Sequence, residues 1–193
     1  FGTGNQDYGI IVETGKPSLG PLTITGYGIK SEKTWDSFCP IPQIPIIDGI
    51  FIPDGKAGSS IVSSSWHIFR ECPDTNGCWS GPITNGAKTI DGDYIPIVDE
   101  VAYGTPNNPA LFMHGNIGIT YDLNKIRAIL PSDQPIGCFT SVVLTPKSSK
   151  DTTLDVWVLV DGQVRFSKTS IDSPVPFHIN VPLAPQEQFL SLV

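Results

Sequence analysis

The residues best suited to a binding role are tryptophans that the sequence places in turn-forming segments. Trp79 follows Cys78 in a stretch of Gly, Asn and Ser, where a large aromatic side chain is difficult to bury. Trp66 lies beside His67, and the sequence leaves it open to either a ligand or a packing role. An exposed indole can stack on the apolar face of a sugar ring while its N–H stays in water. Trp79 and Trp66 are therefore candidate sugar-binding residues.

His114 and Asn116 add hydrogen-bonding groups at the end of an apolar segment. His114 closes residues 110–114, and Asn116 follows after one glycine. Imidazole and carboxamide groups donate and accept hydrogen bonds, as recognition of sugar hydroxyls requires. The alternative is a buried histidine that bonds to a backbone carbonyl and fixes the turn. We expect a shallow polar sugar site in the loops at one end of the fold, with His114 and Trp79 near it.

Acidic residues offer a weaker calcium site. Asp91 and Asp93 form a D-x-D pattern that is followed by Asp99 and Glu100. Calcium prefers about six to eight oxygen ligands, and a short loop supplies several of them through carboxylates and carbonyls. The full EF-hand spacing is missing, so the alternative is a solvated acidic turn. Asp91 and Asp93 are candidate calcium ligands on this basis.

The sequence contains no motif that indicates catalysis. Neither G-x-S-x-G nor H-E-x-x-H occurs, and no glycine-rich phosphate loop is present. We therefore expect a protein that is not an enzyme.

The four cysteines favour disulfides over a metal site. Cys72 and Cys78 bracket a five-residue turn, which predicts a bridge between them and leaves Cys39 and Cys138 as the remaining pair. An even count in such a chain is typical of an oxidising compartment, although four cysteines allow other pairings. Free buried thiols are the alternative. Zinc fits poorly because no C-x-x-C is present.

The overall composition excludes two classes of protein. The 193 residues include 12 Lys and Arg and 19 Asp and Glu, which gives a net charge of −7. Because no excess of positive charge would offset the phosphates of DNA or RNA, we expect no nucleic-acid partner. The apolar runs are too short to cross a bilayer, so we also expect no transmembrane segment.

Short strand-like segments dominate the chain. They are rich in Val, Ile, Thr and aromatic residues and are separated by Gly, Pro, Asn and Asp, which is typical of an all-β sandwich or barrel. Asp161-Gly162 predicts a tight type I′ hairpin turn after residues 154–160, where Trp157 alternates with valines and is expected to pack in the core. Only residues 123–130 predict a helix, which Asp122 would cap.

Residues 1–45 and 46–193 differ in pattern. The first stretch is irregular, and its three prolines between residues 40 and 45 disfavour a central strand there. We expect an N-terminal extension over residues 1–45 and a single β-sandwich over residues 46–193. The last strand-like run reaches Val193 with no turn or polar tail, so we expect the natural polypeptide to continue.

Three segments, taken together and in order, resemble the NPCBM family of carbohydrate-binding modules. Residues 109–123 resemble the family's strand–turn–strand, with His114 at the end of the apolar run. Residues 154–166 are similar to its hairpin, in which a Val-Asp-Gly run precedes a strand that carries an aromatic residue. Residues 177–193 resemble its closing strands, although the Asp/Gly-rich loop and final strand that follow in the family are not in this sequence.

The resemblance implies both a fold and a function. The fold would be a galactose-binding-like β-sandwich, a jelly roll. The function would be the binding of a galactose-type glycan without catalysis. Family members are often attached to glycoside hydrolases or bacterial surface proteins, and parts of this chain also resemble FecR-type cell-surface proteins. We therefore expect an extracellular, cell-surface or periplasmic protein. The alternative is a structural or protein-interaction subunit of an extracellular or cell-envelope assembly, which glycan-binding assays would distinguish.

Overall fold

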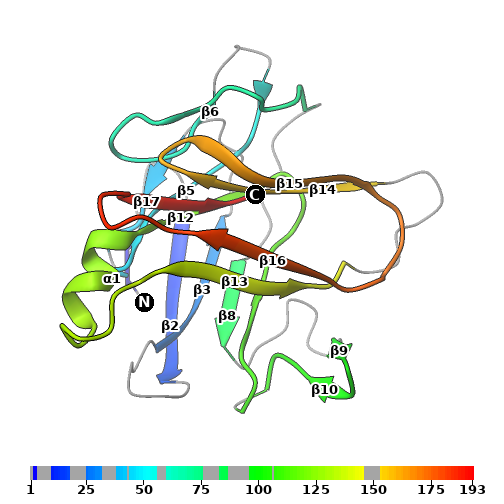
Figure 1. Cartoon of the computed structure of the whole chain (residues 1–193), viewed down its shortest axis with the longest axis horizontal. Coiled ribbons are helices and arrows are strands. Elements are labelled where there is room, and N and C mark those ends of the chain that lie inside the picture. The colour runs from blue at the N-terminus through cyan, green and yellow to red at the C-terminus, as the bar shows by residue number, and fades with distance from the viewer. Residues whose placement is uncertain are drawn as a thin grey trace. The chain divides into compact units, whose positions relative to one another are not determined.

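A computed structural model describes most of the chain, and within the described residues antiparallel strands and one short helix make up the fold (Figure 1). This confirms the all-β prediction. The described ranges are residues 2–3, 10–17, 25–31, 38–42, 44–55, 60–75, 83–86, 96–105, 107–145 and 153–193.

The chain divides into two compact units, each built from two separate stretches. Unit 1 combines Phe1–Trp35 with Cys78–Ile117, and unit 2 combines Asp36–Gly77 with Gly118–Val193. This division differs from the expected boundary at residue 45, because residues 1–35 belong to a unit that the chain completes only after residue 77, whereas residues 36–45 belong to unit 2.

Unit 1 contains a five-stranded sheet in the order β1-β2-β3-β8-β11. Its strands are β1 (Gly2–Thr3), β2 (Ile10–Pro17), β3 (Thr25–Ser31), β8 (Ile83–Gly86) and β11 (Ala110–Phe112). A separate hairpin joins β9 (Ile97–Val98) to β10 (Val101–Ala102). This sheet takes three strands from the described residues of the expected irregular extension, and β3 pairs with β2 and also with β8, more than fifty residues further along the chain.

Unit 2 contains a six-stranded sheet in the order β15-β14-β17-β12-β5-β4. Its strands are β4 (Cys39–Pro40), β5 (Ile47–Phe51), β12 (Gly118–Asp122), β14 (Leu154–Val160), β15 (Gln163–Ile171) and β17 (Phe189–Leu192). Two smaller pairs complete the unit. They are β13 (Cys138–Val143) with β16 (Phe177–Pro182), and β6 (Ser60–Ile61) with β7 (Ile68–Phe69).

Alternation along β14 gives the six-stranded sheet two apolar faces. Val158 packs in one cluster with Ile179 of β16. Leu159 packs in another cluster with Phe69 of β7. Trp157 joins this second cluster, with its ring edge-to-face on Phe69 at 5.2 Å, so its predicted packing role is confirmed. The sheet is therefore covered by β16 on one face and by the β6–β7 segment on the other.

The predicted helix forms with its predicted cap. Helix α1 spans Leu123–Ile129, and the Asp122 carboxylate accepts a hydrogen bond from the Lys125 backbone N at 3.0 Å. The cap satisfies one of the backbone N–H groups that a helix leaves without an internal partner. The helix ends at Ile129, and its C-cap Leu130 stands immediately before Pro131. No helix in the part of the chain that the structure describes is long and apolar enough to cross a membrane.

The turn between β14 and β15 has the predicted geometry. Asp161 has φ +49° and Gly162 has φ +78°, as a two-residue type I′ turn requires. The turn also packs closely on the β6–β7 segment. A Cβ at position 162 would lie 3.0 Å from His67 Cβ and from both the N and the O of Ile68. Only glycine therefore meets both the backbone angle and the space available.

Replacing this glycine should destabilise unit 2. We expect Gly162→Ala to lower the free energy of unfolding by about 1–2 kcal/mol, because the positive φ disfavours a Cβ and the new methyl crowds Ile68. Urea unfolding followed by tryptophan fluorescence measures the change. Gly137→Ala is the matched control, since nothing lies within 4 Å of a Cβ there. Equal stability of the two variants would contradict the close packing at residue 162.

Candidate functional site

The β6–β7 hairpin, residues 60–69, presents an exposed aromatic side chain at its turn. Trp66 is 73% exposed. Its φ is +61°, in the left-handed region that bulky residues rarely adopt. Core packing does not explain a large apolar side chain that is both exposed and held in a strained backbone conformation. Such outliers persist where the surrounding structure enforces them, and they cluster at functional sites.

Hydrogen bonds within the hairpin close the turn around Trp66. The Trp66 backbone N donates to the Ser63 carbonyl at 3.0 Å, and the Val62 backbone N donates to the His67 carbonyl at 2.8 Å. The Ser63 hydroxyl bonds to Nδ1 of His67 at 2.9 Å and accepts from the His67 backbone N at 3.3 Å. The backbone on both sides of the indole is therefore fixed.

Asp48 of β5 ties the turn to the six-stranded sheet. Its buried carboxylate accepts hydrogen bonds from the Ser64 backbone N at 2.7 Å and from the Ser64 hydroxyl at 2.6 Å. Hydrogen bonds to an ionised acceptor are shorter and stronger than neutral ones. The anchor reaches the turn two residues before Trp66.

Hydroxyl groups of the sheet also meet the hairpin. Thr120 of β12 donates through its hydroxyl to the Val62 carbonyl and shares a 2.8 Å hydrogen bond with the Ser191 hydroxyl of β17. Both side chains are fully buried. Since buried polar groups are costly unless they are paired, these bonds fix the hairpin at a defined place on the sheet.

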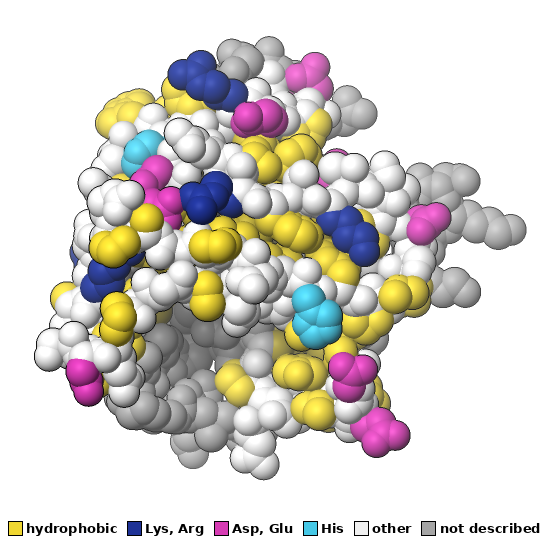
Figure 2. Space-filling model, viewed as in Figure 1, with side chains coloured by type: hydrophobic (Ala, Val, Ile, Leu, Met, Phe, Trp, Pro, Cys, Tyr) yellow, Lys and Arg dark blue, Asp and Glu magenta, His cyan; other side chains and the backbone are white. Residues whose placement is uncertain are grey.

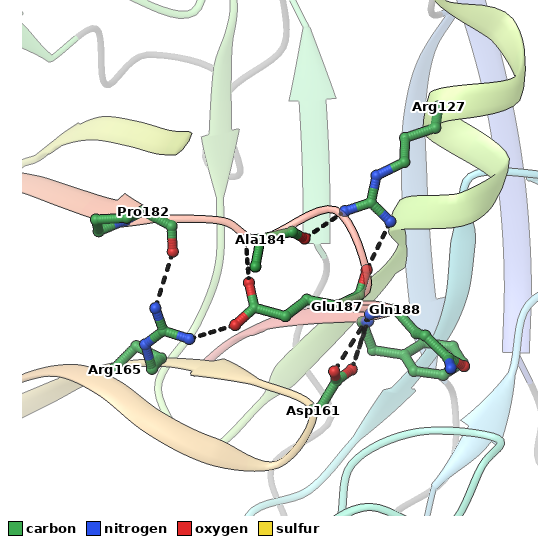
Figure 3. Close-up of polar contacts among 8 residues, drawn as sticks. Arg127, Asp161, Arg165, Pro182, Ala184, Glu187 and Gln188 are labelled. Atoms are coloured by element: carbon green, nitrogen blue, oxygen red, sulfur yellow. Dashed lines mark hydrogen bonds and ion pairs between the residues drawn. The ribbon is translucent and has the colours of Figure 1, made fainter. Parts of the chain in front are cut away.

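The first residue of β17, Phe189, also contacts the hairpin. The His67 ring lies edge-on to the Phe189 ring at 5.5 Å. The Asp161 carboxylate holds Phe189 in place, because it accepts from the backbone N of Phe189 at 2.8 Å and from that of Gln188 at 3.1 Å (Figure 3). The β14–β15 turn thus fixes the residue on which His67 rests.

Two arginines hold the connection between β16 and β17. Arg127 of α1 donates to the carbonyls of Glu187 at 2.6 Å and Ala184 at 3.0 Å. Arg165 of β15 pairs with the Glu187 carboxylate and donates to the Pro182 carbonyl at 3.0 Å. Figure 3 shows both guanidinium groups directed at this connection from opposite sides. Their role is to fix the backbone that leads into β17.

Ser63, His67 and Asp48 do not form a catalytic relay. Ser63 is only 1% exposed, so its hydroxyl is out of reach of a substrate. The Asp48 carboxylate bonds to Ser64 and not to the imidazole that a Ser–His–Asp triad would orient. These side chains hold the turn, and the arrangement is suited to presenting the Trp66 ring.

A second aromatic surface lies between β15 and β16. Phe166 stacks on Phe177 at 6.2 Å, and Lys168 Nζ lies 4.1 Å from the centre of the Phe177 ring. Figure 2 shows hydrophobic and basic side chains beside one another on this face. Both phenylalanines also pack on the core cluster of Val158 and Ile179. Their faces are occupied by each other and by the lysine, so this pair has a packing role.

The other predicted contacts lie in unit 1 or outside the described residues. His114 is half-buried and Asn116 is exposed with φ +58°, and both lie in unit 1, whereas Trp66 lies in unit 2. Trp79, Asp91 and Asp93 lie outside the described residues. Among the described residues, no three His, Cys, Asp or Glu side chains are grouped as metal ligands.

Sequence reasoning missed Asp48 and Ser64, the residues that anchor the site. Their contact spans sixteen positions, and it depends on how the β6–β7 hairpin packs on the sheet that contains β5. The run of three serines at 63–65 before Trp66 was the one local signal of a turn with hydroxyl groups to donate.

No disulfide is present among the cysteines that the structure describes. Cys39, Cys72 and Cys138 are free thiols in the structure, and Cys78 lies outside the described residues. Cys39 is buried in the edge strand β4 of the six-stranded sheet, whereas Cys138 is exposed at the start of β13, in a different sheet. The Cys39–Cys138 bridge expected as the remaining pair is therefore absent, and the expected partner of Cys72 lies outside the described residues. Burial raises the pKa of Cys39 and of Cys72 to about 11, with Asp54 and Asp74 adding to the effect on Cys72.

Comparison with known proteins gives no family assignment. No protein-family model, curated protein or solved structure matches this chain. The resemblance to the NPCBM family therefore rests on the sequence motifs alone.

The cysteines should differ in reactivity. We expect iodoacetamide at pH 8 to modify Cys138 in the folded protein, and to modify Cys39 and Cys72 only after unfolding. A raised pKa leaves less of the reactive thiolate at a given pH, and burial blocks access. Peptide mass mapping after a timed reaction measures each site. Modification of Cys39 as fast as Cys138 would contradict its placement in β4.

Trp66→Asn should stabilise the protein. Asparagine adopts positive φ far more readily than tryptophan, and the exposed indole loses little burial when it is removed. We expect the free energy of unfolding to rise by up to about 1 kcal/mol in urea denaturation. Trp66→Ala is the control, because it removes the same ring and keeps the backbone strain. A marked loss of stability in Trp66→Asn would show that the ring packs against the fold.

Proposed function

We propose that this chain is a carbohydrate-binding module that binds a glycan through Trp66 without catalysis. The observation that carries the proposal is an exposed indole on a turn fixed from several sides. A rigid aromatic face stacks on the apolar face of a pyranose ring at a low cost in conformational entropy. The sequence motifs favour a galactose-type sugar, and an extracellular, cell-surface or periplasmic location is part of the proposal.

The proposed fold is the galactose-binding-like β-sandwich that the motifs imply. Its support is the packing of β16 against one face of the six-stranded sheet of unit 2. Trp79, His114 and Asn116 stay in the proposal as further contacts, with Asp91 and Asp93 as calcium ligands. Binding assays with and without calcium test the last two.

A different surface favours the alternative function, protein interaction in an extracellular assembly. The β9–β10 hairpin exposes Ile97 at 63% together with Val101, and Asp99 and Glu100 form the turn between the strands. Exposed aliphatic side chains beside acidic ones suit a partner with an apolar patch and a basic rim. This alternative gains support if no glycan binds.

Removal of the Trp66 ring should weaken glycan binding. We expect Trp66→Ala to weaken retention of the protein in gels that contain galactan by about fivefold or more. This corresponds to the loss of roughly 1 kcal/mol from one aromatic contact. Xylan and β-glucan gels test the choice of sugar.

Val175→Ala is the matched control for this experiment. Val175 is a 64% exposed apolar residue of the same unit that lies outside the hairpin, and its truncation should leave binding unchanged. Wild-type protein that is not retained by any of these gels, or Trp66→Ala that is retained equally well, would overturn the proposed function.

A further inference from the structure

We infer that Asp48 is a positioning residue that holds Trp66 in its binding conformation through a β-bulge. The inference rests on the proposed function, since it concerns how that site is kept ready for a glycan. Asp48 does not touch the sugar. It acts on the turn that carries the indole.

The bulge is visible in the strand register. Gly49 of β5 pairs with Thr120 of β12, but the next pair joins Ile47 to Tyr121, so Asp48 is an extra residue with no opposite partner. Residues 49 and 51 face the β6–β7 hairpin, as shown by the packing of Phe51 in the hairpin cluster. In a regular strand, Asp48 would point to the opposite face. The bulge redirects the carboxylate to the hairpin, which is a common use of bulges beside functional sites.

The redirected carboxylate makes one specific contact. Among the described residues, both of its hydrogen bonds come from Ser64, one from the backbone N and one from the hydroxyl. Burying a carboxylate is costly, and these two charge-assisted bonds offset that cost only while the turn keeps its shape. Asp48 therefore disfavours any conformation that moves Ser64 away from the sheet.

Ser64 in turn controls the backbone at Trp66. The turn bond from the Trp66 backbone N to the Ser63 carbonyl spans Ser64, so a fixed Ser64 leaves the intervening backbone little freedom. The positive φ of Trp66 is unfavourable by itself, and it persists because these bonds require it. Release of Ser64 would let Trp66 relax to negative φ and turn its ring away from the binding orientation.

The expected effect on affinity follows from populations. The apparent dissociation constant equals the intrinsic one divided by the fraction of molecules in the binding conformation. If loss of the anchor lowers that fraction to about one tenth, affinity falls about tenfold, although no residue in contact with the sugar has changed.

The test compares Asp48→Asn and Ser64→Ala with two matched controls. Ser64→Thr keeps the hydroxyl donor and should therefore bind galactan like the wild type. Ser65→Ala removes a neighbouring exposed hydroxyl that makes no bond to Asp48. Two quantities are measured for each protein. One is the dissociation constant for galactan, and the other is the Trp66 indole N–H signal in ¹⁵N NMR spectra, assigned by its loss in Trp66→Phe.

We expect Asp48→Asn and Ser64→Ala to weaken galactan binding by about fivefold to tenfold and to shift or broaden the Trp66 indole signal. Ser64→Thr and Ser65→Ala should behave like the wild type. An unchanged indole signal and an unchanged dissociation constant in Ser64→Ala would overturn the inference, even if Asp48→Asn fails to fold. The NMR measurement decides the positioning role without a ligand.

The two proposals fail in different ways. If Trp66→Ala binds galactan as well as the wild type, the proposed function is wrong, whatever Asp48 does. If Trp66→Ala loses binding while Asp48→Asn and Ser64→Ala keep both binding and the wild-type indole signal, only the positioning role is wrong.

Discussion

The six-stranded sheet of unit 2 has to bury two apolar faces, and the position of the candidate site follows from this constraint. Val158 and Leu159 point to opposite sides of β14, and each is fully buried. Burying either face contributes a large apolar area to stability, so each face must be covered by another segment. The β6–β7 hairpin covers one of them with Val62 and Phe69. Because Val62 and Phe69 flank the turn and lie against the sheet, the turn between them is held at the surface of the sheet.

Polar side chains then fix the position of the hairpin along the sheet, which apolar packing alone leaves variable. Hydrophobic contacts are not directional, so a hairpin held only by Val62 and Phe69 could slide on the sheet. Thr120, Ser191 and Asp48 come from three neighbouring strands and bond to defined atoms of the hairpin or to each other. Each of these groups is buried and would be destabilising without its partner. These bonds thereby hold the turn at a single position on the sheet.

Local signals predicted the parts of this structure that depend on local chemistry. The Asp122 cap and the Asp161-Gly162 turn lie where the sequence places them, because a cap or a tight turn is determined by a few adjacent residues. The pairing of β3 with β8 and the Asp48 anchor were not predictable in this way. Both depend on which distant strands become neighbours, and the anchor further requires one extra residue at a bulge. The expected Cys39–Cys138 bridge is absent for the same reason, since spacing alone does not show which cysteines meet.

Trp66 is the side chain that the stability of the fold does not explain. Its ring is mostly exposed, its backbone is strained, and asparagine or glycine would suit the same turn better. The surrounding bonds do not relieve this strain, because the anchors at Ser63 and Ser64 maintain the turn that imposes it. A strained backbone that carries a large exposed aromatic side chain marks a position used for something other than folding. A flat, exposed and immobilised aromatic ring is suited to stacking against a ligand, and this is the physical reason for placing the glycan site at the hairpin.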